Sequence, residues 1–211
     1  MKILMYGDSI TDAIRLREEA IGSVYSYGNG YVKFISGDLA LKDPHGYEII
    51  NRGISGNRIV DLYARVKADV WNHNPDVLSI LIGVNDIWHE LSYENGVDVV
   101  RFERMYRMLL DDTLARLSDI KLILCEPFVL KGSATEEKFD RFLETYDYAK
   151  AVKRIAEDYG AYFLPLQAVL SEAAEKYGAE TVLSDGVHPA TLGAKIIADE
   201  WLKLFFEKVD K

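Results

Sequence analysis

The chain contains very little cysteine or proline. Among its 211 residues there are five prolines and one cysteine, Cys125, so no disulfide can form within the chain. A chain of this length can bury a sufficient core without disulfides, and their absence is typical of proteins in a reducing compartment. Cys125 lies in the apolar run KLILCEP, where we expect a buried, unreactive thiol.

Basic residues are also few: 25 lysines and arginines stand against 34 acidic residues, giving a formal net charge of −9. This balance argues against nucleic acid and anionic membranes as partners, because both require basic patches. Long hydrophobic runs are missing as well. The apolar residues 3–6 before Gly7 are too few for a signal peptide, and no segment approaches the length of a transmembrane helix. We therefore expect a cytoplasmic protein.

What the chain does have is an alternation of short apolar segments with longer amphipathic ones. Residues 102–117 are typical of the second kind, because Met105, Leu109 and Leu117 recur at helical spacing. No repeat or linker interrupts this order, so we expect a single domain over residues 1–211. The pattern predicts strands at residues 2–6, 47–51, 76–82, 121–125 and 162–164, and helices at residues 31–41, 59–71, 102–117, 142–159, 167–177 and 189–207.

Strands that are apolar throughout and alternate with helices indicate a parallel sheet covered on both faces. We therefore predict an α/β fold of three layers, α/β/α, built on a five-stranded, doubly wound parallel sheet of flavodoxin-like order. In such sheets, ligands bind at the carboxyl ends of the strands. The loops GDSIT, RGISGN and GVNDIW follow the first three predicted strands, and the loop SDGVHP precedes the last helix.

Two of these loops carry residues suited to nucleophilic catalysis. Asp185 and His188 in SDGVHP are three residues apart, so the carboxylate can orient the imidazole and leave its Nε2 free as a base. Ser9 in GDSIT needs such a base, because a free hydroxyl is a poor nucleophile. The alternative is turn chemistry, since Gly, Asp and Ser form turns and cap helices. The G-x-S-x-G elbow of α/β-hydrolases is absent, so a nucleophilic Ser9 would indicate another hydrolase architecture.

Acyl transfer also needs hydrogen-bond donors for the oxyanion that develops on the carbonyl oxygen. Gly56 in RGISGN can bring its backbone N–H close to a substrate, because it has no Cβ. Asn85 in GVND can add a side-chain N–H, and the amide of Ser9 is a third candidate at a helix N-terminus. Glycine and asparagine are also ordinary turn residues. The catalytic interpretation is favoured by the placement of one component in each loop of a single sheet edge.

Together the four loops resemble the conserved blocks of the SGNH (GDSL-like) hydrolases. The blocks here are GDSIT, RGISGN, GVND and DGVHP, and the resemblance covers the whole chain. The first block has isoleucine where the family pattern has leucine. The resemblance implies serine esterase chemistry without a metal or cofactor. Its implied residues are Ser9 as nucleophile, His188 as base, Asp185 as the residue orienting that base, and Ser9, Gly56 and Asn85 as oxyanion donors.

Longer segments, GISGNRIVDLYARV, IGVNDIW and DGVHPATLGAKIIADEWL, are similar to the intracellular acetylxylan esterases of this family. This similarity implies removal of acetyl groups through an acyl-enzyme, with a small acetylated sugar or xylo-oligosaccharide as the partner. A lysophospholipase, a thioesterase or a general short-chain arylesterase would use the same chemistry. A non-catalytic flavodoxin-like binding module would share the fold but would give Asn85, Asp185 and His188 no role. The sequence leaves the oligomeric state open, a homo-oligomer included.

Several residues close to the blocks are candidates for substrate binding. Trp88 can stack on a sugar ring or simply pack its own loop, and the segment YSYGNGY (residues 25–31) can border a pocket or pack likewise. The candidates are Asp8, Arg58, Trp88 and His89. The histidines outside SDGVHP lack the neighbouring ligands of a metal site, so no metal is expected; they are His45, His73 and His89.

Overall fold

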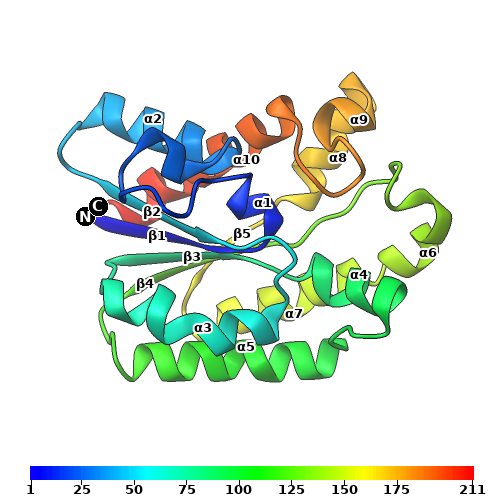
Figure 1. Cartoon of the computed structure of the whole chain (residues 1–211), viewed down its shortest axis with the longest axis horizontal. Coiled ribbons are helices and arrows are strands. Elements are labelled where there is room, and N and C mark those ends of the chain that lie inside the picture. Colours follow the sequence, from blue (N-terminus) through cyan, green and yellow to red (C-terminus); the bar gives the residue numbers. More distant parts are fainter.

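The computed structural model describes residues 1–211, and its centre is one five-stranded sheet (Figure 1). The strands are β1 (Lys2–Gly7), β2 (Glu48–Gly53), β3 (Val77–Leu81), β4 (Lys121–Cys125) and β5 (Tyr162–Leu164). They lie in the order β2-β1-β3-β4-β5, and every neighbouring pair is parallel. The predicted flavodoxin-like order and α/β/α class are therefore confirmed.

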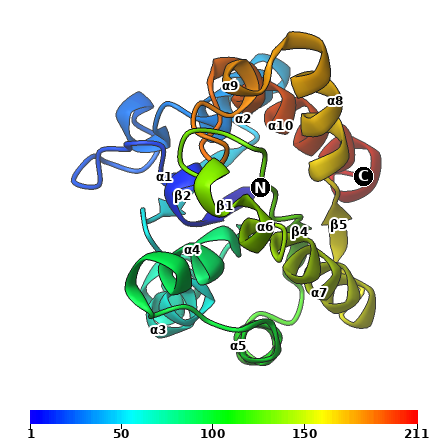
Figure 2. The same cartoon turned by 90° about the vertical axis from the view of Figure 1, so that its right-hand side faces the viewer.

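Helices cover both faces of the sheet, as Figures 1 and 2 show. On one face α2 (Tyr31–Lys42) packs against α10 (Thr191–Leu204), and on the other α5 (Val99–Leu114) contacts both α3 (Ile59–Asp69) and α7 (Thr145–Asp158). The remaining α-helices are α1 (Ser9–Asp12), α4 (Val84–Tyr93), α6 (Phe139–Phe142), α8 (Gln167–Tyr177) and α9 (Ala179–Val182). Short 3₁₀ turns span Val24–Tyr27, Trp71–His73 and Glu136–Lys138, and a π-helical turn, Phe205–Val209, ends the chain's last helix. None of these helices combines the length and the apolar character needed to cross a membrane.

The apolar strands are explained by burial on both sides of the sheet. Ile3 and Met5 of β1 are completely buried, and every residue of β3 is at most 2% exposed. Trp201 of α10 closes the core on one face: its indole N–H donates to the Ser79 hydroxyl over 3.0 Å, and its ring stacks on Phe205 with centroids 4.8 Å apart. This packing fixes the sheet and, with it, the loops at the carboxyl edge.

Close backbone packing at that edge brings the first two loops together. A Cβ placed on Gly53, the last residue of β2, would lie 2.2 Å from the backbone nitrogen of Asp12 in α1. A Cβ on Gly7, the last residue of β1, would lie 2.4 Å from the carbonyl oxygen of Leu81. Both positions therefore require glycine, and α1 rests directly on the end of β2.

The segment after β3 differs from the prediction. We expected loop residues there, but α4 begins at Val84, directly after Gly83 with its φ of +140°. Ile87 and Leu91 of this helix pack into the core at helical spacing. Asn85 therefore lies in the first turn of a helix, which holds its side chain more rigidly than a loop would.

Candidate active site

Ser9 is the first residue of α1 and follows β1 by a single tight turn. The Asp8 carboxylate caps this helix, accepting the Ile10 N–H over 2.9 Å. The helix then ends after one turn, because Ala13 and Ile14 adopt φ values of +44° and +62°. A positive φ is unusual for a β-branched residue, and such strain is concentrated at functional sites. The turn leaves the Ser9 side chain partly exposed at the carboxyl edge of the sheet.

The structure joins Ser9 to the two residues predicted to activate it. Ser9 Oγ lies 2.8 Å from His188 Nε2, and His188 Nδ1 lies 2.7 Å from Asp185 Oδ2. The other carboxylate oxygen, Oδ1, accepts the backbone N–H groups of Val187 over 2.9 Å and His188 over 2.8 Å. These two bonds fix the carboxylate so that Oδ2 faces the imidazole.

The protonation states follow from these contacts. The hydrogen bond to Asp185 raises the pKa of His188, although burial opposes this rise. Burial acts to raise the pKa of Asp185, but the hydrogen bonds from the His188 side chain and the backbone outweigh it and lower the pKa to about 2. Asp185 is therefore ionised at neutral pH and accepts the Nδ1 proton. Nε2 of the neutral imidazole is left as an acceptor for the Ser9 hydroxyl proton.

Two of the three predicted oxyanion donors, Gly56 and Asn85, lie in adjacent segments. The loop of residues 54–57, hereafter the Gly56 loop, follows β2, and Gly56 has a φ of +82°. The Asn85 side chain donates one N–H to the Asn57 carbonyl over 3.1 Å, which ties α4 to this loop. The Gly56 N–H makes no hydrogen bond within the protein. A free backbone N–H and a second amide proton on Asn85 are therefore available at this edge.

A cavity of about 400 Å³ opens beside Ser9 and His188. Ile14, the residue with a φ of +62°, lines this cavity and is 83% exposed. Asn29 and Gly30 of the predicted segment 25–31 also border it, so that segment contributes to the pocket wall. The full lining is Ser9, Ile10, Ala13, Ile14, Asn29, Gly30, Ser55, His188 and Pro189.

The aromatic candidates, Trp88 and His89, do not belong to this lining, and Trp88 lies next to His188. The Trp88 ring is 5.9 Å from the His188 ring and 5.8 Å from Phe142, measured between centroids. Trp88 thus packs its own surroundings and flanks the imidazole, without lining the cavity. His89 packs edge-on against Tyr93 at 5.5 Å. Contact of Trp88 or His89 with a substrate stays a prediction.

The two charged candidates are engaged within the protein. Asp8 is completely buried beneath Ser9, and its Oδ2 has no hydrogen-bond partner. Burial raises the pKa of Asp8 to about 7. Arg58 pairs with Asp61 over 2.9 Å and donates to the Asn95 carbonyl over 2.5 Å. Neither side chain points freely to solvent, so their contact with a substrate stays a prediction too.

Asp86, next to Asn85, supports the site from within the protein. It is 1% exposed, and burial raises its pKa well above the usual value. Its Oδ1 accepts the Ile59 N–H over 3.1 Å, which joins the start of α4 to the start of α3. This contact agrees with the expectation that the acid holds the GVND segment in place.

The structure contains no group of three histidine, cysteine, aspartate or glutamate side chains arranged to hold a metal ion. Cys125 is buried in β4 as predicted, and burial raises the pKa of its thiol to about 12. The sequence patterns missed Ser55 and Asn57 of the Gly56 loop and Pro189 of the cavity wall. The only sequence signal for Ser55 and Asn57 is their membership of the RGISGN block, in which Gly56 was the residue singled out.

Comparisons with known proteins agree with this geometry. The model of the GDSL-like lipase/acylhydrolase family matches residues 5–196. An acetylxylan esterase of Geobacillus stearothermophilus is 36% identical in an alignment of 208 positions that covers 96% of this chain and 92% of that protein.

Solved structures extend the similarity to three dimensions. A GDSL-like lipase of Parabacteroides merdae superposes with a TM-score of 0.92 at 36% identity, covering 98% of this chain and 96% of that one. Axe2, an acetylxylan esterase of G. stearothermophilus, superposes with a TM-score of 0.84 at 35% identity, covering 96% of this chain and 92% of that one. Catalytic mutants of Axe2 replace a serine, an aspartate or a histidine by alanine.

Proposed function

The chain belongs to the GDSL-like lipase/acylhydrolase family, and on this premise we propose that it removes acetyl groups from hydroxyls of small carbohydrates with Ser9 as nucleophile. The hydrogen-bonded chain from Ser9 through His188 to Asp185 carries the proposal. Its two links measure 2.8 and 2.7 Å, within the range for proton transfer along a catalytic triad.

In the first half-reaction, Ser9 Oγ attacks the ester carbonyl carbon while its proton moves to His188 Nε2. The ionised Asp185 stabilises the imidazolium, and the carbonyl oxygen becomes a tetrahedral oxyanion. The amides of Ser9 and Gly56 and the side chain of Asn85 supply its hydrogen bonds. The tetrahedral adduct then collapses: the bond to the sugar oxygen breaks, and His188 gives its proton to that oxygen. An acetyl-enzyme remains.

In the second half-reaction, His188 takes a proton from water, and the resulting hydroxide attacks the acetyl carbon. The same donors hold the second oxyanion. Collapse breaks the bond to Ser9 Oγ, which takes from His188 the proton that came from water, and acetate leaves. His188 passes on each proton that it takes, the Ser9 proton to the sugar oxygen and the water proton to Ser9, so the reaction needs only water as a co-substrate.

The acetylated-carbohydrate substrate is supported by the relatives. An acetylxylan esterase is found both as a sequence relative and among the solved structures, and two structures of Axe2 variants are described as an acetyl-xylooligosaccharide esterase. Within this chain, Trp88 beside His188 offers an aromatic surface on which a sugar ring can stack. Neither the alternative acyl substrates nor the non-catalytic binding module is favoured by these relatives.

We further propose a single domain over residues 1–211 and a cytoplasmic location. The one sheet with its continuous core supports the first, and the lone buried thiol of Cys125 supports the second. The net charge of −9 supports a neutral sugar partner over nucleic acid or an anionic membrane.

A side-by-side rate comparison tests the substrate. We expect kcat/KM to be highest on acetylated xylo-oligosaccharides and p-nitrophenyl acetate and to fall about tenfold or more by the octanoate ester, because a longer acyl chain needs its own pocket. The Ser9→Ala variant should lose about six orders of magnitude in kcat on every ester, while Ser36→Ala on α2 serves as a control for serine removal. A preference for octanoate would contradict the deacetylase assignment but not the esterase chemistry.

A further inference from the structure

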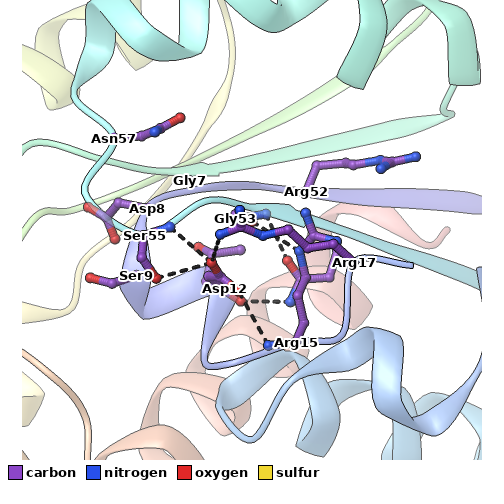
Figure 3. Close-up of polar contacts among 12 residues, drawn as sticks. Gly7, Asp8, Ser9, Asp12, Arg15, Arg17, Arg52, Gly53, Ser55 and Asn57 are labelled. Atoms are coloured by element: carbon purple, nitrogen blue, oxygen red, sulfur yellow. Dashed lines mark hydrogen bonds and ion pairs between the residues drawn. The ribbon is translucent and has the colours of Figure 1, made fainter. Parts of the chain in front are cut away.

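Asp12 is a second acidic residue in α1, and the chain of Ser9, His188 and Asp185 does not use it. It closes the single helical turn that Ser9 opens and is 3% exposed. In Figure 3 its carboxylate lies between Ser55 on one side and Arg17 on the other. A buried carboxylate three residues from the nucleophile needs a reason to be there, because burying a charge is costly unless it is fully hydrogen-bonded.

The Asp12 carboxylate is fully engaged. Oδ2 accepts the backbone N–H of Ser55 over 2.9 Å, the Ser55 hydroxyl over 3.0 Å and Arg17 Nη2 over 2.6 Å. Oδ1 accepts the backbone N–H of Arg15 over 3.3 Å. Burial acts to raise the pKa of Asp12, but the bonds from Arg17 and Ser55 outweigh it and hold the pKa below its usual value. Asp12 is therefore charged at neutral pH.

Ser55 depends on Asp12 for its position. Both of its hydrogen bonds, from the backbone N–H and from the hydroxyl, go to this carboxylate. Its neighbours are held by other groups: the Ile54 N–H donates to the Gly7 carbonyl over 3.1 Å, and the Asn57 carbonyl accepts from Asn85 over 3.1 Å. Asp12 is thus the one side chain that anchors the Gly56 loop immediately before Gly56.

The direction of the Gly56 N–H is set by rotation about the two backbone bonds that flank its peptide group. Glycine places little restriction on its own φ, so the peptide group between Ser55 and Gly56 can turn easily. A turned peptide would point its carbonyl oxygen, instead of its N–H, toward a developing negative charge. Fixing Ser55 at two atoms opposes that rotation, and preorganised donors are what makes an oxyanion hole effective.

We propose that Asp12 is a positioning residue that holds the Gly56 N–H in the oxyanion hole by binding Ser55. This inference rests on the proposed roles of Ser9 and Gly56. The first helical turn after β1 then has two functions: its first residue supplies the nucleophile, and its last orients a donor on the neighbouring loop. Gly53 makes this contact feasible, because only glycine lets α1 approach the end of β2 so closely.

Four variants separate this role from others. Asp12→Ala removes both bonds to Ser55 and should lower kcat on p-nitrophenyl acetate about 10- to 100-fold, with KM within about threefold of wild type. This loss is smaller than the roughly 100- to 1,000-fold loss caused by removing an oxyanion donor outright, because the Gly56 N–H is still present but less well oriented. Asp12→Asn keeps one acceptor and should fall between wild type and Asp12→Ala. Ser55→Ala keeps the backbone bond and should lower kcat by about fivefold at most. Arg17→Ala is the matched control, because it removes the charge partner and leaves both Ser55 bonds in place.

A transition-state analogue gives a readout that a purely structural role would not move. Phenylboronic acid forms a tetrahedral adduct with an activated serine and places an oxygen in the oxyanion hole. Its affinity should fall in proportion to kcat in the Asp12 and Ser55 variants, whatever their melting temperatures, and stay close to wild type in Arg17→Ala. If Asp12→Ala does not fold, Asp12→Asn takes its place, with at least about a threefold loss in both quantities expected.

Two results would overturn the inference. One is a kcat and a boronate affinity within about twofold of wild type in Asp12→Ala, or in Asp12→Asn if the alanine variant does not fold. The other is an equal loss in Arg17→Ala and the Asp12 variant, which would assign the effect to the ion pair. An active Ser9→Ala enzyme would instead overturn the proposed function itself, so the two failures are distinguishable.

Discussion

Replacing Asp185 with asparagine should damage catalysis more than its small change in shape suggests. The reason lies in the two carboxylate oxygens. Oδ1 accepts backbone N–H groups from Val187 and His188 at 2.9 and 2.8 Å, and only an oxygen can fill that position. The asparagine amide must therefore turn its NH₂ group toward His188 Nδ1, where the wild-type acceptor Oδ2 lies at 2.7 Å.

An NH₂ group facing Nδ1 reverses the tautomer. Nδ1 becomes the acceptor, so the imidazole proton moves to Nε2 and points at Ser9 Oγ, 2.8 Å away. An Nε2–H cannot take the hydroxyl proton. The corresponding change in the well-studied serine protease triad costs about 10⁴-fold in kcat. We expect a loss of the same order here, which corresponds to about 5.5 kcal/mol in the activation barrier.

The assay is hydrolysis of p-nitrophenyl acetate, followed from pH 5 to pH 9 for wild type, Asp185→Asn and Asp185→Ala. The alanine variant leaves either tautomer accessible, so asparagine should be at least as damaging as alanine. In wild type, kcat/KM should rise with pH as His188 loses its proton, with an apparent pKa above the usual histidine value because Asp185 raises it. An asparagine variant that keeps more than about a tenth of the wild-type kcat would refute the tautomer reasoning.

Three further predictions concern residues around the triad. Asn85→Ala should lower kcat about 100-fold or more with little change in KM, measured on the same ester, because it removes an oxyanion donor; a change confined to KM would contradict that role. Asp8→Asn should become more stable relative to wild type as the pH rises from 4 to 7. In wild type the buried Asp8, with a pKa of about 7, stays protonated in the folded state while the same residue ionises in the unfolded state. This difference lowers the free energy of unfolding of wild type by about 4 kcal/mol above pH 7, and the asparagine variant does not incur it. Urea unfolding at pH 4 and pH 8 measures this difference, and an equal gain at both would count against it. Gly53→Ala should lower both stability, by about 3 kcal/mol, and kcat, because its Cβ would lie 2.2 Å from the Asp12 nitrogen and displace α1; a variant with wild-type melting temperature and kcat would show that the backbone yields easily.

The sequence allowed the strand order and the catalytic candidates to be predicted, because both follow from general rules. Apolar strands alternating with helices restrict the topology, and the carboxyl-edge rule then places Ser9, Gly56 and Asn85 in neighbouring loops. The structure has the predicted strand order and a hydrogen bond between Ser9 and His188, which are separated by 179 positions in the chain. The role of Asp185 could be predicted from the local sequence, because a residue three positions before His188 in a turn can reach its imidazole.

Contacts between loops could not be predicted in the same way. The bond from Asp12 to Ser55 depends on how closely α1 approaches the end of β2, and nothing in the spacing of these two residues indicates that distance. The helix starting at Val84 was missed because it begins one residue after a glycine in what looked like a loop. Trp88 illustrates the remaining ambiguity of aromatic residues: it both packs on Phe142 and flanks His188.

The central claim is that Ser9 is the nucleophile that carries the acyl group. Labelling the native enzyme with a fluorophosphonate, followed by peptide mass spectrometry, tests it directly, because such reagents phosphonylate only activated serines. We predict a single adduct on the peptide that contains Ser9, and no adduct and no esterase activity in Ser9→Ala. An adduct on another serine, or an Ser9→Ala protein that still labels and hydrolyses acetyl esters, would contradict the assignment.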